Sequence, residues 1–392
     1  MSRRGGLLLL PGSSAGELVP GWIDFEPSTG RITALTPDAA AAIGSPVVIA
    51  PGLIDLHVHG YGGAEPLRDL AGMAAALARA GTTGFQPTLF PAAPAKLGVL
   101  AEQVWRAAAH LPAAGARVLG LHLEGPFVNP LAAGALPRED LAEPSVAALA
   151  AILGPATGDG RGVRTLTLAP ELAGAAALIA ELERLGVRAS FGHSRATAQE
   201  ARAALHAGRP AAGSAPFGVT HLFNAMTGVH HRQPGLASLA LTDEALSVEL
   251  IGDLVHVGPE AIELALAARG PAAIALVSDA LVGAGTGCDV FHSHGRAHHI
   301  HGGAAWYLAE GDAPERLAGS ATGQLDAVRG LVAAGIVALE DALTMASLAP
   351  ARALGLAGEV GELRVGARAD LLLLAGPELA LAEVLVGGLP IA

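Results

Sequence analysis

The spacing of apolar residues changes character twice along the 392-residue chain. Residues 1–50 contain short apolar runs separated by Pro-Gly, Pro-Ser and Pro-Asp pairs: 7–10, 18–25, 30–35 and 47–49. The same kind of run returns near the other end of the chain: 361–363, 370–374 and 385–388. Short apolar runs bounded by turn residues predict small antiparallel strands. We therefore predict one small β domain that both termini build together, from residues 1–50 and 351–392.

Between residues 51 and 350, short apolar runs alternate with Ala- and Leu-rich helical stretches. The predicted strands cover residues 54–58, 84–88, 118–123, 165–168, 188–191, 219–222, 246–251 and 273–277. The predicted helices lie at 67–80, 95–110, within 145–153, 173–185, 197–207 and 259–268. Strand–helix alternation predicts a parallel α/β fold, and about eight such strands predict a closed (β/α)8 barrel.

Composition and charge narrow the class of protein. Hydrophobic residues make up 51% of the chain and charged residues only 15%, so a large core is available. The formal net charge is −12 and Lys and Arg are scattered, which excludes the basic footprint of a nucleic-acid-binding protein. The apolar runs 7–10 and 371–374 are far shorter than the ~18 residues of a membrane span. Cys288 is the single cysteine, which excludes a disulfide within the chain. We expect a cytoplasmic protein that binds neither nucleic acid nor membrane.

A pair of histidines ends the first predicted barrel strand. Alternate residues of a strand point to the same face, so His57 and His59 can bind one metal ion together. His-x-His alone is a weak signal, and a polar cap on the strand is the alternative. The preceding apolar segment 51–56 and the glycines at 60, 62 and 63 strengthen the metal interpretation, since the pair then lies where a buried strand opens.

Further candidate ligands follow other predicted strands. Glu124 comes directly after strand 118–123, with His122 on the same face, and His193 and His221 each follow a later strand. Each of them alone is more often a structural residue. Functional residues of a (β/α)8 barrel gather at the carboxyl ends of its strands, and these positions all qualify. Together they predict a metal centre.

Asp279 is the candidate general acid and base. It ends the segment that contains the predicted strand 273–277. A divalent ion lowers the pKa of a bound water to about 7, and a nearby carboxylate can accept its proton and pass it to a leaving amine. A helix N-cap is the alternative role for this residue.

Two further groups of polar residues stand out. Asn224, Arg232 and His256 offer an amide, a guanidinium and an imidazole, which suit a phosphate or carboxylate, although each alone more often lies on a solvated surface. Five histidines lie between residues 291 and 301. That stretch could bind adventitious metal, and we expect it to be an exposed loop.

Several segments, taken together and in order, resemble the N-acetylglucosamine-6-phosphate deacetylase family of the amidohydrolase superfamily: Pro51–Gly60, Leu121–Phe127, Gly192–Ser194, Thr220–Met226, Arg232–Gly235, Val277–Ala280 and Leu317–Ser320. The resemblance implies a (β/α)8 barrel flanked by a β-sandwich from both termini, usually as a homodimer. It implies hydrolysis of N-acetylglucosamine 6-phosphate to glucosamine 6-phosphate and acetate. It also implies one or two divalent ions, of zinc, iron, manganese or cobalt.

The resemblance carries over residue by residue. It implies that Glu124, His193 and His221 bind the principal metal, that His57 and His59 form a second metal position, and that Asp279 is the acid and base. The implied substrate contacts are Asn224, Ala225, Arg232 and His256. Of these, Arg232 and His256 could serve the site of a neighbouring subunit.

Two positions depart from the family pattern. Leu136 stands where the family usually has a substrate-contacting histidine, and Asp253-Leu254 replaces the usual Asp-Gly. These departures keep alternatives open: a deacylase for N-acyl amino acids or non-phosphorylated amino sugars, a cyclic amidase, or an inactive barrel with a binding role. Arg232 and His256 favour an anionic substrate, and the complete set of candidate ligands disfavours an inactive barrel.

Overall fold

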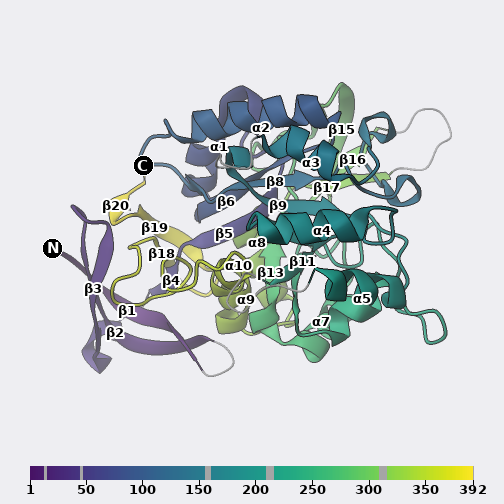
Figure 1. The fold of residues 1–392 in the computed structure, drawn as a ribbon. Coiled ribbons are helices and arrows are strands. Elements are labelled where there is room, and N and C mark those ends of the chain that lie inside the picture. The colour runs from purple at the N-terminus through teal and green to yellow at the C-terminus, as the bar shows by residue number, and fades with distance from the viewer. Residues whose placement is uncertain (13–15, 45–46, 155–159, 209–215, 309–315, 392) are drawn as a thin grey trace.

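A closed parallel barrel forms the body of the molecule (Figure 1). The structure is a computed structural model and describes residues 1–12, 16–44, 47–154, 160–208, 216–308 and 316–391. Within these residues the barrel has eight strands in chain order: β5 (Leu53–Val58), β6 (Thr82–Leu89), β8 (Leu121–Glu124), β9 (Val163–Leu168), β10 (Arg188–Phe191), β11 (Phe217–Val219), β12 (Leu246–Ile251) and β13 (Ile274–Val277). The short β7 (Arg117–Val118) pairs with β6 beside them. The predicted fold class is confirmed.

The first and last barrel strands meet at their carboxyl ends. Val58 and Ala280 form a parallel bridge, the amide of Asp279 donates to the carbonyl of His57 at 2.8 Å, and the amide of His59 donates to Ala280 at 2.9 Å. The backbone that closes the barrel therefore carries three of the predicted site residues.

Helices cover the outside of the barrel. They are α1 (Pro66–Arg79), α2 (Pro94–Ala108), α3 (Val146–Leu153), α4 (Ala175–Arg184), α5 (Ala198–Ala207), α6 (Leu236–Thr242), α7 (Pro259–Arg269), α8 (Gln324–Ala333), α9 (Leu339–Ala346) and α10 (Leu348–Ala353). The six predicted helices are all present, with ends within a few residues. At α5 a capping box between Thr197 and Glu200 sets the start. The helices α6, α8, α9 and α10 were not predicted.

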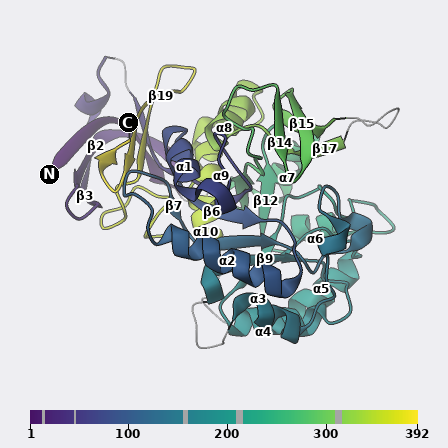
Figure 2. The same ribbon diagram turned by 90° about the horizontal axis from the view of Figure 1, so that it is seen from above.

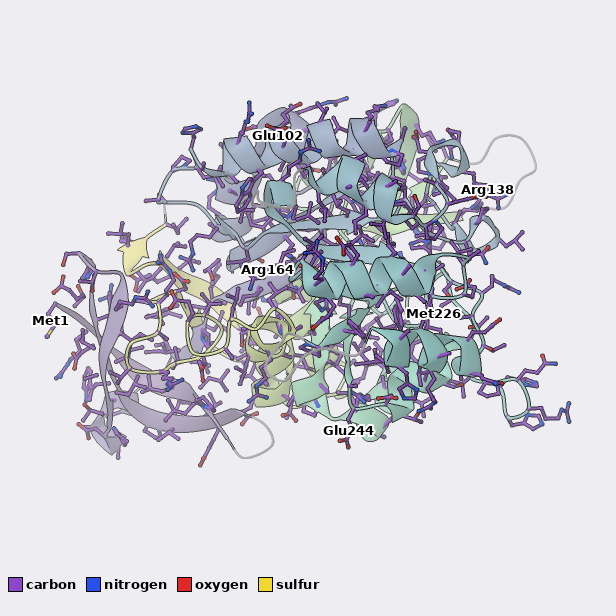
Figure 3. The ribbon with its side chains drawn as sticks, in the orientation of Figure 1. Met1, Glu102, Arg138, Arg164, Met226 and Glu244 are labelled. Carbon is purple, nitrogen blue, oxygen red and sulfur yellow. The ribbon has the colours of Figure 1, made fainter. Side chains whose placement is uncertain are left out.

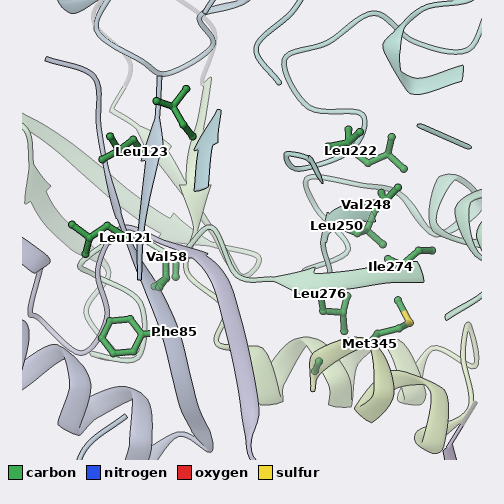
Figure 4. Packing of buried hydrophobic residues seen from close by; sticks show 14 of the residues in the cluster. Val58, Phe85, Leu121, Leu123, Leu222, Val248, Leu250, Ile274, Leu276 and Met345 are labelled. Atoms are coloured by element: carbon green, nitrogen blue, oxygen red, sulfur yellow. The ribbon is translucent and has the colours of Figure 1, made fainter. Parts of the chain in front are cut away.

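The apolar core lies between the strands and these helices. Figure 4 shows Val58, Phe85 and Leu121 on one side of the barrel and Leu250 and Leu276 on the other. Each of these side chains is fully buried. Apolar side chains from strands that are far apart in the sequence thus fix the positions of the strand ends.

The two termini build a separate sheet, as predicted. Its strands follow the order β20 (Leu389–Pro390), β19 (Ala380–Val386), β18 (Leu371–Ala375), β4 (Val48–Pro51), β1 (Ser2–Pro11), β2 (Gly16–Glu26) and β3 (Arg31–Pro37). The predicted strand 361–363 is absent, and residues 366–369 instead join the two edges of the sheet. The amide of Ile32 on β3 donates to Ala367, and the amide of Gly388 beside β19 donates to Ala369. The sheet therefore closes around its own small core.

The histidine-rich stretch is folded, so the prediction of an exposed loop was wrong. It contributes β14 (Val290–Ser293) and β15 (Arg296–His301) to an antiparallel sheet with β16 (Ala304–Tyr307) and β17 (Arg316–Ser320). His298 is buried, and its ring packs between Phe291 and Tyr307 at centroid distances of 4.8 and 4.9 Å. The strand register places these three rings on one face, where they exclude water.

The terminal sheet and the candidate site lie at opposite ends of the molecule. In Figure 3, Met1 marks the sheet, whereas Arg138 and Met226, from loops that follow β8 and β11, mark the far end. Viewed from above in Figure 2, the sheet of β14 to β17 also lies away from the termini. Among the described residues, no helix is both long and apolar enough to cross a bilayer.

An ion pair links the terminal sheet to the barrel. Arg117 donates two hydrogen bonds to the carboxylate of Asp370, which also accepts the amide of Gly387 at 2.7 Å. The Asp370 side chain is 5% exposed and that of Arg117 is 27% exposed. Loss of Asp370 would remove the carboxylate that accepts two hydrogen bonds from the partly buried Arg117 guanidinium.

We expect Asp370→Ala to lower the free energy of unfolding by about 2–3 kcal/mol, because charged hydrogen bonds in buried surroundings are worth about that much. Differential scanning calorimetry would show a melting transition several degrees lower. Asp326→Ala is the matched control, since Asp326 pairs with Arg329 but its side chain is 57% exposed. Equal losses in the two variants would contradict the prediction.

Candidate metal centre

The predicted ligands converge at the carboxyl end of the barrel. His57 lies on β5 and His59 just beyond it, Glu124 ends β8, and His193 and His221 each lie two residues beyond β10 and β11. All five side chains are at most 6% exposed. Residues spread over 165 positions of the chain thus meet in one buried cluster, because parallel strands end at the same face.

The carboxylate of Glu124 lies between two pairs of histidines. Its Oε1 is 2.9 Å from His193 Nε2 and 3.1 Å from His221 Nε2, and those two nitrogens are 3.0 Å apart. On the other side, Glu124 Oε2 is 3.2 Å from His59 Nε2, which lies 3.1 Å from His57 Nε2. The arrangement is two groups of three ligands that share one carboxylate.

These distances fit divalent metal ions. Ligand atoms bound to one ion at about 2.1 Å are about 3.0–3.4 Å apart in octahedral or tetrahedral geometry. The outer nitrogen of His193 donates to the carbonyl of Ala132 at 2.9 Å, which leaves Nε2 free to bind an ion. Neutral imidazole and carboxylate ligands suit zinc, iron, manganese and cobalt.

Burial and mutual contact set the charges of these groups. Burial holds the pKa of His57 well below its ordinary value, so the imidazole is neutral, as a metal ligand must be. Burial opposes ionisation of Glu124, but His57 and the hydrogen-bonding imidazoles His193, His221 and His59 outweigh it and keep the pKa of Glu124 well below the usual range. The cluster therefore presents the carboxylate of Glu124 and the neutral imidazole of His57.

Asp279 lies beside the second histidine pair. Its Oδ1 is 3.4 Å from His57 Nε2 and 3.5 Å from His59 Nε2. Burial, together with the charge of Glu124, raises the pKa of Asp279 well above its ordinary value. A neighbouring divalent cation would oppose this rise. A carboxyl group whose pKa is raised by burial and would be lowered by a nearby cation is suited to accept a proton and return it.

Two of the candidate ligands and the candidate acid and base have left-handed backbone. The φ angles are +47° at His193, +35° at His221 and +49° at Asp279. Only a few per cent of non-glycine residues adopt positive φ, and such residues cluster at functional sites. Each of these residues lies two positions after its strand, so the backbone turns sharply just where the strand ends.

A cavity of about 150 Å³ opens over the ligands. Its walls include Glu124, His193, His221 and Asp279, with Leu136 and Ala135 from the loop after β8. The sheet of β14 to β17 supports this loop, because Tyr307 donates to Ala135 O and Arg316 donates to Gly134 O. A larger cavity of about 790 Å³ lies at the amino ends of β8 to β10 and contains none of the candidate ligands.

Phe90 is a wall residue that the sequence analysis missed. It directly follows β6, and its ring stacks on His59 with a centroid distance of 3.9 Å and an angle of 16°. An aromatic residue after a strand has no distinctive spacing. Its position at the same strand end as the ligands was the available signal.

The predicted substrate contacts divide into two groups. Asn224, Ala225 and His256 line the cavity. Asp253 fixes His256, since its Oδ2 lies 2.6 Å from His256 Nδ1 and its Oδ1 accepts the amide of His256. Arg232 is exposed and does not line the cavity of its own chain.

Polar side chains continue into the barrel below the ligands. His122 contacts the carbonyl of Leu56 through Nδ1 and Thr167 through Nε2, and burial lowers its pKa to about 3. Both of its nitrogens are therefore occupied and it is a structural residue.

Arg188 and Glu249 form an ion pair of 2.8 Å in which both side chains are at most 2% exposed.

The fold and the site together define the class of protein as a metal-dependent hydrolase built on a (β/α)8 barrel. Comparisons with known proteins agree with this class. The Amidohydrolase family model matches residues 48–389, and this chain belongs to the amidohydrolase family. N-acetylgalactosamine-6-phosphate deacetylase of Escherichia coli O157:H7 is 35% identical over 366 residues, covering 90% of this chain and 92% of that protein. N-acetylglucosamine-6-phosphate deacetylase of Bacillus subtilis (strain 168) is 32% identical over 332 residues, covering 83% and 80%.

Solved structures agree over the whole length. N-acetyl-D-glucosamine-6-phosphate deacetylase from Mycobacterium smegmatis, in the structure of a point variant with N-acetyl-D-glucosamine-6-phosphate, is similar with a TM-score of 0.84 and 31% identity, covering 100% of both chains. The N-acetylglucosamine-6-phosphate deacetylase from Thermotoga maritima has a TM-score of 0.85 and 25% identity, covering 100% and 99%.

Glu124 belongs to both groups of candidate ligands, so its substitution tests the metal content. We expect Glu124→Gln to weaken metal binding at both groups of candidate ligands, because each needs its charge, whereas His59→Asn should affect only the group that contains His57. Inductively coupled plasma mass spectrometry of the purified variants measures this directly. His292→Asn, at an exposed position on β14, is the control. Full metal content in Glu124→Gln would contradict the assignment.

Proposed function

We propose that this chain hydrolyses the acetamide of N-acetylglucosamine 6-phosphate and releases acetate and glucosamine 6-phosphate. The observation that carries the proposal is the carboxylate of Glu124, placed within ligand distance of two histidine pairs beside a carboxyl group with a raised pKa. Glu124, His193 and His221 would hold one ion, and His57, His59 and Glu124 a second. The names of the relatives and the sugar phosphate bound in the Mycobacterium smegmatis structure support the substrate.

The bound ions would supply an acidified water and polarise the amide oxygen. The water oxygen would form a bond to the acetyl carbon, Asp279 would accept the proton that this water loses, and it would deliver that proton to the amine nitrogen as the C–N bond breaks, so that acetate and the free amine leave. Asp279 Oδ1 lies 3.4 Å from His57 Nε2 and 3.5 Å from His59 Nε2, so the carboxylate faces the group of candidate ligands that contains this histidine pair. The buried walls exclude bulk water, which strengthens each of these interactions.

The part of the substrate beyond the acetamide needs groups outside the deep cavity. Ligand sites usually measure about 300–1,000 Å³, and this cavity is about 150 Å³. The acetamide and part of the sugar ring would fill it, against Asn224 and His256. The phosphate would then project out of the cavity and would need a cation there.

N-acetylgalactosamine 6-phosphate is the second candidate substrate. It is favoured by the Escherichia coli relative, which covers more of this chain than the Bacillus subtilis relative does. The two sugars differ only at one hydroxyl. Comparing kcat/KM for both phosphates, for free N-acetylglucosamine and for N-acetyl amino acids separates the candidates. A higher value for the galactosamine phosphate would assign the second candidate, and equal activity on free N-acetylglucosamine, which is uncharged, would remove the requirement for an anion.

We expect Asp279→Asn to reduce kcat by about 10²- to 10⁴-fold while metal content stays unchanged, because it removes the proton carrier and keeps the shape. Acetate release and metal analysis on the same sample measure both quantities. Asp326→Asn, far from the cavity on α8, is the control. Near-full turnover by metal-loaded Asp279→Asn would show that another group carries the proton.

We also propose a homodimer in which Arg232 binds the phosphate in the partner's site. Arg232 lies in an exposed segment, residues 228–234, that projects beyond its own cavity. A guanidinium is well suited to a phosphate because it donates two parallel hydrogen bonds.

Mixing two inactive variants tests whether Arg232 acts between subunits. Asp279→Asn lacks the proton carrier and Arg232→Ala lacks the phosphate ligand, so each alone should be impaired at low substrate concentration. A mixed dimer would contain one site with both groups intact. We therefore expect activity to return after unfolding and refolding the two variants together. If mixtures are only as active as the sum of the separate variants, Arg232 does not act across a dimer.

A further inference from the structure

A buried acceptor and a buried donor lie close together beneath the candidate centre without partners. Among the described residues, His57 Nδ1 and Glu249 Oε2 have no hydrogen-bond partner, although both atoms are fully buried. They are 3.9 Å apart. An unpartnered buried polar atom costs about 1–3 kcal/mol, so two of them facing each other call for an explanation.

The chain makes specific room for this carboxylate. Arg188 on β10 reaches past β11 to Glu249 on β12, and it can do so because Gly218 lies between them. A Cβ at residue 218 would lie 2.4 Å from Arg188 Nη2. Arg188 is held in turn by Ser247 Oγ at 2.6 Å. The guanidinium binds Glu249 Oε1 and leaves Oε2 directed at the imidazole.

We propose that Glu249 is a positioning residue that accepts the Nδ1–H of His57 and so orients this imidazole for the second metal position. A neutral imidazole that binds an ion through Nε2 must carry its proton on Nδ1, and a carboxylate is a common outer partner for such a nitrogen. A shift of about 1 Å closes the gap, and the terminal torsions of His and Glu side chains are soft enough to allow it.

Two other readings of this group are weaker. His57, His122 and Glu249 also lie within the spacing of a third metal site. That reading fails because both nitrogens of His122 are already engaged, with Leu56 and Thr167. The other reading is that Glu249 only neutralises Arg188. A purely structural buried ion pair can usually be replaced by apolar residues without loss, and this difference can be tested.

The inference rests on the metal centre of the proposed function, and its test is metal binding rather than turnover. The double variant Arg188→Met/Glu249→Met removes both buried charges together and leaves no hydrogen-bond acceptor at residue 249 for His57 Nδ1. If Glu249 orients His57, the double variant keeps the ion held by Glu124, His193 and His221 and binds the other about 10- to 100-fold more weakly. Titration with Zn²⁺ against a coloured chelator measures both affinities. Wild-type affinities for both ions would overturn the inference.

Ser247→Ala is the matched control, because it removes a partner of Arg188 but leaves Glu249 facing His57. It should bind both ions as the wild type does. A crystal structure of the zinc-loaded wild type tests the contact without any substitution. We expect His57 Nδ1 within about 3.2 Å of Glu249 Oε2, the range of a hydrogen bond. A separation above about 3.5 Å would overturn the inference, even if the double variant fails to fold.

The outcomes separate this inference from the proposed function. A wild-type protein that holds one ion and leaves His57 unbound overturns the role of Glu249 but leaves deacetylation intact. A wild-type protein that binds no metal at all contradicts the proposed function itself.

Discussion

Burying a carboxylate costs several kcal/mol unless its surroundings compensate, and Glu124 is buried among four histidines, of which His57 is held neutral by burial. Hydrogen bonds from uncharged donors stabilise a carboxylate but cannot cancel its charge. A divalent cation on either side of Glu124 would both stabilise this charge and offset it. The electrostatics of this one residue therefore favour metal binding, and the histidine pairs on its two sides determine where the ions would lie.

The barrel makes this cluster possible because it fixes the strand ends before the site residues begin. The side chains of Val58, Leu250 and Leu276 are fully buried in the apolar core between the strands and the surrounding helices, where they fix the strand positions (Figure 4). The chain can then tolerate left-handed backbone at His193, His221 and Asp279, at a cost of order 1 kcal/mol each. Backbone strain of this kind persists only where the surrounding packing fixes the backbone, and it turns each side chain away from the direction of its strand.

Period and position in the sequence were enough to select the residues that the structure brings together as candidate ligands. His57 and His59 share a face because side chains alternate along a strand, and Glu124 could be placed because it follows an apolar run. The pair Arg188 and Glu249 could not be found in this way. Each lies in an otherwise ordinary strand, and they meet only because β10 and β12 flank β11 in the closed barrel. Helices α8 to α10 were missed although Leu325, Val328 and Leu331 give α8 a helical period; none of the three helices has a side-chain N-cap that would mark its start.

Leu136, which stands where the family usually has a histidine, affects how this site could polarise an amide oxygen. Its side chain lines the cavity but can neither donate nor accept a hydrogen bond, so this wall cannot polarise an amide oxygen. The loop that carries it is fixed by Tyr307 and Arg316, which leaves little freedom for another group to take its place. Polarisation would then depend on the metal ions themselves, and so on His57 and His59. A site with this dependence needs His57 held in one orientation, and Glu249 is the buried carboxylate within reach of its free nitrogen.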